Sequence, residues 1–332
     1  GQEGYQTAFF YGGYAIFDGM KSFFYDNGWN EIVDQPDFPD AAFRTSWGVV
    51  YRSVAWVVAW GLEHRNLDGV SAIGVDEIAV WKGQSYLTVV YQLDQGARRL
   101  LWVGLERTEQ TLLRFFDFFG EPRSRALRFI ASDMWKPYLT AIAERADQAI
   151  HVLDRYHIVA KLNKAIDEVR AKEVRELARR GFEPVLKHTR FCLLKRPENR
   201  TAQQDLKLRD VLQYDLRTVR GHLLKQAFEA FWTYTSPYWA GWFLDRWCMR
   251  AMRSRLEPFK KFARTLRSHR DLLLNWFRAK KEVSSAIVEA MNANAKLAVR
   301  KARGFRTYEA TEIALYHVLG ALPEPEWTHA FC

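Results

Sequence analysis

Hydrophobic and polar positions alternate with two different periods along this chain, and the change from one to the other lies near His157. Residues 1–40 follow neither period well and predict a loose lead-in with one short helix near Ala15–Tyr25. From Ser46, which suits a helix N-cap, apolar residues recur at helical spacing and predict a helix over Trp47–Leu62.

Residues 71–157 then show short β-branched and aromatic runs, separated by turn residues and by helical segments. The predicted order is three strands (71–81, 85–93 and 98–104), a helix from Thr108 to Phe119, a strand (127–132), a helix (137–146) and a strand (149–153). This order predicts a mixed α/β core and excludes a sandwich or a helical bundle.

The strand pattern stops after His157. Residues 158–281 show the spacing of amphipathic helices rich in Lys, Arg and Trp, with breaks at 181–184, 195–201 and 235–237. Residues 283–321 predict one or two further helices that join at Gly304. The pattern therefore predicts a large all-helical insertion before the last part of the core.

Length and composition narrow the class of protein. With 332 residues, 48% hydrophobic and 27% charged, the chain can form one large or two ordinary globular domains. No apolar run reaches the roughly 18 residues of a membrane span, and Gly1–Tyr14 lacks the basic start and apolar core of a signal peptide. The cysteines Cys192, Cys248 and Cys332 are too widely spaced for a zinc knuckle or a disulfide framework, which favours a reducing cytoplasm.

Charge is distributed unevenly along the chain. The net charge of +10 arises from roughly −5 in residues 1–150 and roughly +15 in residues 151–332. Such asymmetry indicates a polyanionic partner, and nucleic acid is the first candidate because Lys and Arg neutralise its phosphates. A membrane surface or a solvated basic face is the alternative that composition alone leaves open.

Two acidic residues, Asp76 and Glu77, lie inside the otherwise apolar first strand. A carboxylate pair there costs free energy unless a charged group compensates it, although a strand end that reaches water would explain it equally well. Asp133 follows the fourth predicted strand, and Glu289 lies in a late helix. Three carboxylates with open coordination positions suit Mg²⁺ or Mn²⁺, which support phosphoryl transfer.

Several ordered blocks of the chain resemble the ISL3-type transposases, a family of DDE transposases from bacterial insertion sequences. The matching blocks are Gly74–Glu77, Ala131–Tyr138, Val152–Val159, Leu193–Asn199, Asn275–Phe277, Ser284–Asn292, Lys296 and Arg300–Tyr308. The resemblance covers about residues 45–320 and is far more specific than a single motif.

The resemblance implies a ribonuclease-H-like mixed sheet core interrupted by an all-helical insertion. It implies metal-dependent DNA cleavage at transposon ends and strand transfer into target DNA, with Asp76, Asp133 and Glu289 as catalytic metal ligands and Mg²⁺ or Mn²⁺ as cofactor. It also implies homo-oligomers on DNA, a cytoplasmic, nucleoid-associated location and no membrane. A catalytically idle DNA-binding remnant and a ribonuclease-H-like nuclease without strand transfer are the alternatives.

Asp154 and His157, spaced i and i+3 after the last strand, resemble an element found in related transposase groups. A direct catalytic role and a local hydrogen bond that orients His157 at a helix start are equally consistent with this spacing. Asp133 is the expected second metal ligand because of the strand order, and Asp154 is its alternative.

Two groups of residues are candidate DNA contacts. In the insertion, Trp239 and Trp242 lie near Arg246 and Arg250 in the sequence. Aromatic residues interleaved with Arg can stack on unpaired bases and bind phosphates. Most of the tryptophans, however, are expected in the helix core. The second group is basic and follows Glu289: Lys296, Arg300, Lys301, Arg303 and Arg306. A solvated helix face would look similar, but beside a metal site a phosphate contact is favoured.

The predicted organisation is a lead-in (1–45), a helix related to a helix-turn-helix region (46–70), the first part of the catalytic core (71–157), the helical insertion (158–281) and C-terminal helices that complete the core (282–322). Family members usually carry an N-terminal zinc-binding module and a helix-turn-helix domain. No Cys cluster precedes the core here, so a truncated member that lacks end recognition is expected.

Overall fold

The computed structural model describes residues 40–81, 85–182, 185–279, 285–301, 305 and 307–325. Residues 1–39 of the predicted lead-in, with its short helix, lie outside these residues, as does the junction at Gly304. The chain divides into two compact units, residues 1–149 with 284–332 and residues 150–283.

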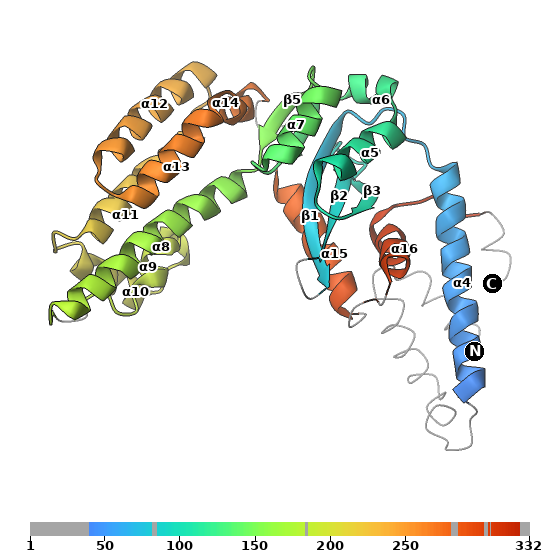
Figure 1. Ribbon diagram of the computed structural model, residues 1–332, viewed down its shortest axis with the longest axis horizontal. Helices are drawn as coiled ribbons and strands as arrows, with labels where there is room; N and C mark the ends of the chain where they lie inside the picture. Colours follow the sequence, from blue (N-terminus) through green and yellow to red (C-terminus); the bar gives the residue numbers. More distant parts are fainter. Residues whose placement is uncertain are drawn as a thin grey trace. The chain divides into compact units, whose positions relative to one another are not determined.

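The first unit contains helix α4 (Asp40–His64) and the strands β1 (Ala72–Trp81), β2 (Ser85–Gln92) and β3 (Arg99–Leu105). Helices α5 (Glu109–Phe119) and α6 (Glu121–Ala126), strand β4 (Phe129–Ser132) and helix α7 (Lys136–Arg145) follow. Helices α15 (Ser285–Lys301) and α16 (Tyr308–Leu319) complete the unit (Figure 1).

The strands of the first unit form a mixed sheet in the order β3-β2-β1-β4, and the remaining strand, β5 (Ile150–Leu153), belongs to the second unit. Strand β1 pairs antiparallel with β2 and parallel with β4, and β2 pairs antiparallel with β3. This mixed α/β sheet with many helices agrees with the fold class predicted from the sequence, and the expected neighbourhood of the first and fourth strands is confirmed.

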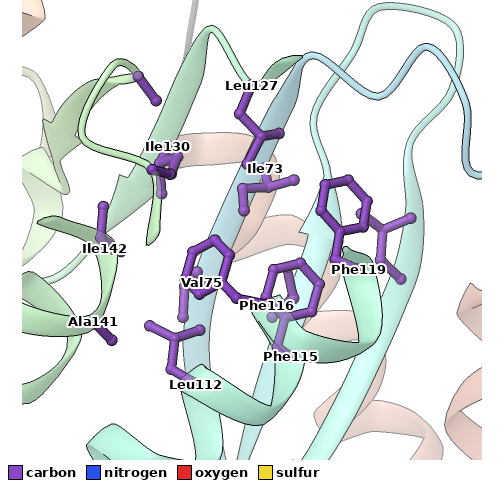
Figure 2. Packing of buried hydrophobic residues seen from close by; sticks show 14 of the residues in the cluster. Ile73, Val75, Leu112, Phe115, Phe116, Phe119, Leu127, Ile130, Ala141 and Ile142 are labelled. Carbon is purple, nitrogen blue, oxygen red and sulfur yellow. The ribbon is translucent and has the colours of Figure 1, made fainter. Parts of the chain in front are cut away.

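One face of the sheet is covered by α5 and α7. Alternate residues of β1 face opposite sides of a sheet, so Ile73 and Val75 share the side that packs on these helices. They belong to a buried core cluster with Leu112, Phe115, Phe116, Phe119, Ile130, Tyr138 and Ile142 (Figure 2). Burying these large side chains is the main driving force for assembling this layer.

Capping residues explain where α5 begins and ends. The Thr108 side chain accepts a hydrogen bond from the backbone N–H of Thr111, and Gly120 follows the helix with a φ of 87°. That conformation favours glycine because it has no Cβ. Pro122 occupies the first turn of α6, where its missing N–H is not needed.

Helix α4 corrects the sequence prediction, because it begins at Asp40 and not after Ser46. Ser46 therefore lies inside the helix. No Gly or Pro separates Asp40 from Ser46, and Ala41 and Ala42 have high helix propensity, so nothing in this segment stops the helix from starting earlier.

The second unit is helical after β5. Its helices are α8 (Arg155–Arg179), α9 (Arg190–Leu194), η1 (Pro197–Asn199), α10 (Ala202–Val211), α11 (Arg217–Glu229), η2 (Ala230–Thr233), α12 (Pro237–Arg253), α13 (Glu257–Ser268) and α14 (Arg270–Arg278). Aromatic rings fill its core, with Phe228 stacked on Phe231 and in contact with Trp247. Among all helices of the described residues, none has the length and apolar character that crossing a bilayer requires.

Candidate active site

The pairing of β1 with β4 places two aspartates at the same level of neighbouring strands, Asp76 within β1 and Asp133 just after the end of β4. Gly74 is level with Ala131 in the parallel register, and Asp76 and Asp133 each follow two residues later. Both side chains are half-buried. Ligand sites in α/β proteins usually lie at the carboxyl ends of parallel strands, so this edge of the sheet, where β4 ends beside β1, is the candidate active site.

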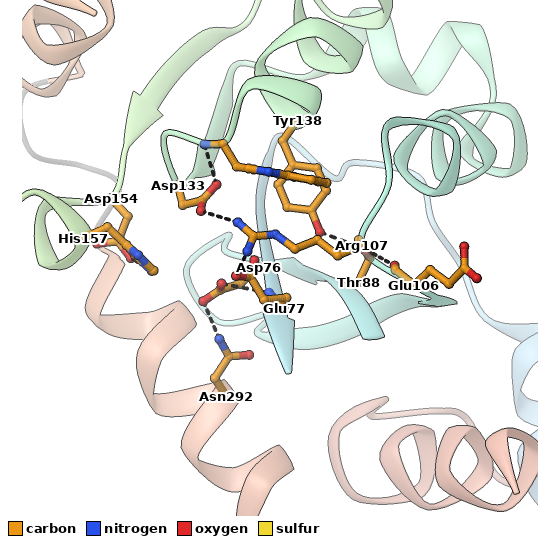
Figure 3. A network of polar contacts seen from close by, with 11 residues as sticks. Asp76, Glu77, Thr88, Glu106, Arg107, Asp133, Tyr138, Asp154, His157 and Asn292 are labelled. Carbon is orange, nitrogen blue, oxygen red and sulfur yellow. Dashed lines mark hydrogen bonds and ion pairs between the residues drawn. The ribbon is translucent and has the colours of Figure 1, made fainter. Parts of the chain in front are cut away.

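Arg107, just after β3, links two of the acidic side chains at this edge (Figure 3). Its Nη1 lies 2.8 Å from Glu77 Oε1, and its Nη2 donates to Asp133 Oδ2 at 2.9 Å. The guanidinium also lies over the Trp135 ring, 4.3 Å from its centroid. The backbone N–H of Trp135 donates to Asp133 Oδ1 at 2.9 Å, so Asp133 is held on both oxygens.

Glu77 is the least compensated carboxylate of the site. Its Oε2 is buried and has no hydrogen-bond partner in the described part of the chain. Burial raises the pKa of Glu77 to about 7, and the charges of Asp133 and Asp76 add to this effect, while Arg107 and Lys296 oppose it.

The Asp76 side chain lies on the face of the sheet opposite to the one covered by α5 and α7, and it points toward α15. Its Oδ2 accepts a hydrogen bond from Asn292 Nδ2 at 2.5 Å, and Asn292 Oδ1 accepts one from the Tyr91 hydroxyl at 2.8 Å. Asn292 and Tyr91 are buried, and burial strongly raises the pKa of the Tyr91 phenol, so Tyr91 stays a donor. These two hydrogen bonds connect β2 through α15 to β1 and fix the orientation of Asp76, whose bond to Asn292 is seen in Figure 3.

Gly74 explains how α15 comes so close to β1. A Cβ on Gly74 would lie 2.5 Å from Val288 Cγ2, which is too short for a carbon–carbon contact, and 3.2 Å from Leu93 Cδ1, which is tighter than usual. Only glycine therefore admits the buried Val288 at this point. Glu289 is the next residue on α15, where its side chain is exposed, one turn before Asn292. The predicted packing of this helix beside the strand of Asp76 is confirmed.

The donor chemistry of this edge fits a hard divalent cation. Carboxylate oxygens are the ligands that Mg²⁺ and Mn²⁺ prefer, and the buried, unpartnered Glu77 Oε2 is an oxygen free to accept one. The described residues contain no group of three or more His, Cys, Asp or Glu side chains already arranged as metal ligands. The oxygens of Asp76 and Asp133 are bound by Asn292, Arg107 and backbone N–H groups.

Asp154 and His157 belong to the second unit. Asp154 is the N-cap of α8, and its Oδ1 accepts a hydrogen bond from the backbone N–H of Tyr156 at 2.7 Å. His157 Nε2 lies 3.6 Å from Asp154 Oδ2. This distance is longer than a hydrogen bond, so the two side chains lie near each other without the hydrogen bond that the spacing suggested, and Asp154 instead caps α8 through the backbone of Tyr156.

The predicted DNA contacts lie on exposed helix faces where they are described. Trp239, Trp242, Arg246 and Arg250 are exposed on α12, and Lys296 and Arg300 are exposed on α15. The side chain of Lys301, and Arg303 and Arg306, lie outside the described residues. Trp232 and Trp247, in contrast, are buried in the core of the second unit.

Sequence reasoning did not assign Arg107, Asn292 and Tyr91 to the site. Arg107 gives no signal in the sequence, because it is one of many Arg residues and follows an ordinary strand. Asn292 could have been found, since it is three residues after Glu289 and therefore lies on nearly the same side of the helix. Tyr91 is recognisable only through the register of β2 with β1, where it is level with Gly74.

Comparison with known proteins points in the same direction as this geometry. Residues 73–315 match the family model of the ISL3 group of DDE transposases, whose members are described as transposases. The transposase for insertion sequence element IS1001 of Bordetella parapertussis is 29% identical over 242 residues, which are 72% of this chain and 59% of that protein. The transposase for insertion sequence element IS1557 of Mycobacterium tuberculosis is 29% identical over 293 residues, 80% of this chain and 64% of that protein.

The chain thus spans less than two thirds of the length of these curated relatives. The family match, however, begins inside β1 and ends inside α16, so it includes Asp76, Asp133, Glu289 and the whole helical second unit. By this match the chain belongs to the ISL3 family of DDE transposases.

Proposed function

We propose that this protein cleaves DNA strands at the ends of an insertion sequence and joins them to target DNA, with a divalent cation held by Asp76, Asp133 and Glu289. The observation that carries the proposal is the parallel register of β1 and β4, which brings Asp76 and Asp133 to one edge of the sheet. Family membership supports transposition as the reaction class.

The cation, Mg²⁺ or Mn²⁺, would supply Lewis-acid activation of the attacking oxygen and stabilisation of the leaving oxygen in phosphoryl transfer. Asp76 and Asp133 are the best-placed ligands, and Glu289 on the adjoining helix is the proposed third. Asn292 keeps the Asp76 carboxylate in one orientation through its bond to Tyr91. Such orienting partners of metal ligands affect metal affinity strongly in other sites.

Arg107 has a different part in this proposal. Its positive charge offsets the repulsion between Glu77 and Asp133, which would otherwise push the strand ends apart. A cation bound by Asp133 would reduce the need for this compensation. Arg107 therefore holds the acidic edge together when no cation is bound.

DNA is the proposed partner of the basic residues near the site. Lys296 and Arg300 follow Glu289 on α15 at intervals of seven and eleven residues, and both are exposed. At 1.5 Å of rise per residue, they extend a basic stripe of about 10–17 Å along the helix from the proposed metal ligand. This length spans several nucleotides of a DNA strand, since phosphates follow each other at about 3.4 Å along the helix axis.

Nicking of a plasmid that carries the element ends tests the proposal. Asp76→Asn, Asp133→Asn and Glu289→Gln should each abolish Mg²⁺-dependent nicking and leave DNA binding nearly unchanged, because only the charge needed in the transition state is lost. Asp117→Asn and Glu121→Gln remove exposed carboxylates elsewhere in the first unit and serve as matched controls. Nicking by the three site variants at the rate of these controls would refute the assignment. DNA binding without nicking by the unaltered chain would identify a binding protein instead.

A further inference from the structure

Helix α12 carries large aromatic side chains on its solvent face. Its buried side consists of Ala240, Leu244, Trp247, Cys248 and Ala251, which pack into the core of the second unit. On the opposite side, Tyr238 is 73%, Trp239 is 54% and Trp242 is 46% exposed. Exposing three large rings in a row costs hydrophobic free energy that burial would recover, which marks the face as an interaction surface.

The same face is positively charged. Arg246, Arg250 and Arg253 are exposed at intervals of one helical turn after Trp242, and within the described part of the chain none of them forms an ion pair with an acidic side chain. The acidic residue of this helix, Asp245, is already bound by Arg270 through two hydrogen bonds of 3.0 Å. The surface therefore offers unneutralised cations to an anionic partner.

Arg246 and Trp242 are joined before any ligand binds. The guanidinium carbon of Arg246 lies 4.6 Å from the Trp242 ring centroid, in a cation–π contact. This contact fixes the indole at the helix surface, so less side-chain entropy is lost when a second planar group stacks on it.

The relative orientation of the rings indicates which form of nucleic acid fits. The ring planes of Tyr238 and Trp239 make an angle of 79°, and those of Trp239 and Trp242 make an angle of 80° at a centroid distance of 6.2 Å. Bases stacked on these rings would be nearly perpendicular to one another. A duplex holds its bases parallel and hides their faces, whereas splayed, unpaired bases can adopt such angles.

We propose that the Tyr238–Trp239–Trp242 face of α12 binds a DNA strand with unpaired bases, which stack on the indoles while Arg246, Arg250 and Arg253 contact its phosphates. The inference rests on the proposed function for the identity of the ligand, DNA, and specifies in addition that the bound DNA is unpaired. It places the recognition of melted or frayed DNA in the helical second unit.

The test compares binding of a labelled single-stranded oligonucleotide of 12 nucleotides with binding of the blunt duplex of the same sequence, by fluorescence anisotropy of the full chain in EDTA. The double variant Trp239→Ala/Trp242→Ala should raise the Kd for the single strand roughly 10-fold or more, since a base–aromatic stack contributes about 1–3 kcal/mol. The Kd for the duplex should change less than about twofold.

Trp239→Phe/Trp242→Phe keeps two aromatic faces and should retain most of the single-strand affinity, which separates stacking from loss of fold. Tyr214→Ala removes an exposed aromatic ring elsewhere in the second unit and is the matched control. Equal weakening on single strand and duplex would overturn the proposal, as would unchanged binding of both. Unchanged DNA binding with altered sedimentation would assign the face to a second copy of the chain.

Because binding is measured without metal, failure here leaves the cleavage proposal intact. Loss of nicking in Asp76→Asn, in turn, leaves the binding result unaffected.

Discussion

Replacing Gly74 by Ala tests how the close approach of α15 to β1 builds the site. The new Cβ would lie 2.5 Å from Val288 Cγ2, and carbon atoms in contact prefer about 3.5–4.0 Å, so one of the two must move by roughly 1–1.5 Å. Val288 has little freedom to rotate, because it is buried and a β-branched residue in a helix strongly prefers one rotamer. Helix α15 should therefore shift.

The expected cost can be stated for both stability and activity. Overpacking of this kind lowers the free energy of unfolding by about 1–3 kcal/mol. Because Glu289 and Asn292 move with the helix, a shift of about 1 Å should also slow DNA nicking on the order of 100-fold. Urea unfolding and the plasmid nicking assay measure the two effects on the same protein preparation.

A second substitution distinguishes a specific clash from general damage. Val288→Ala removes the clashing methyl group and by itself should lower the free energy of unfolding by about 1.5–2.5 kcal/mol through lost burial. In the double variant Gly74→Ala/Val288→Ala the new methyl partly fills the vacated space, so the loss should be smaller than the sum by about 1–2 kcal/mol, and nicking should recover in part. Additive losses without recovery, or a neutral Gly74→Ala, would refute the reasoning.

Three further outcomes are expected. DNA affinity should fall about 10³–10⁵-fold between 50 and 200 mM salt if about 6–10 phosphates are contacted, and a flat salt profile would exclude DNA as the partner of the basic residues. Asp154→Ala should lower the free energy of unfolding by about 0.5–2 kcal/mol through loss of the α8 cap but retain metal-dependent nicking, and loss of nicking with full activity in Asp133→Ala would make Asp154 the second ligand. Burial lowers the pKa of His222 to about 4, and both of its ring nitrogens lack a partner among the described residues. As pH falls from about 6.5 to 4, the imidazole is protonated in the unfolded chain before it is protonated in the folded one, so the folded state loses stability. Between pH 7 and pH 5 the free energy of unfolding of the native protein should therefore fall by roughly 2 kcal/mol more than that of His222→Leu. Equal decreases in the two proteins would contradict this.

The sequence was most informative where periodicity is local. The strand with Asp76, the cap at Thr108 and the change of pattern after His157 each depend on residues close together in the chain, and the structure has a strand or helix at each of these places. The start of α4 was missed because Ser46 is a good cap but is equally tolerated inside a helix, and nothing before it breaks the helix.

The interactions around the carboxylates could not be predicted in the same way. The bond between Asn292 and Asp76 joins residues 216 positions apart, and the bridge from Arg107 to Asp133 depends on how β3, β1 and β4 are aligned. From composition, we expected most tryptophans of α12 to be buried. Whether each one is buried depends on the face of the helix that it occupies: Trp247 is buried and Trp239 is exposed.

The identity of the metal ligands is tested most directly by anomalous diffraction from crystals of the chain grown with Mn²⁺. We expect an anomalous peak coordinated by the carboxylates of Asp76 and Asp133, with Glu289 as the third protein ligand, and loss of that peak in Asp76→Asn. A peak bound to Asp154 and not to Asp133, or no peak at the edge of β1 and β4 at saturating Mn²⁺, would contradict it.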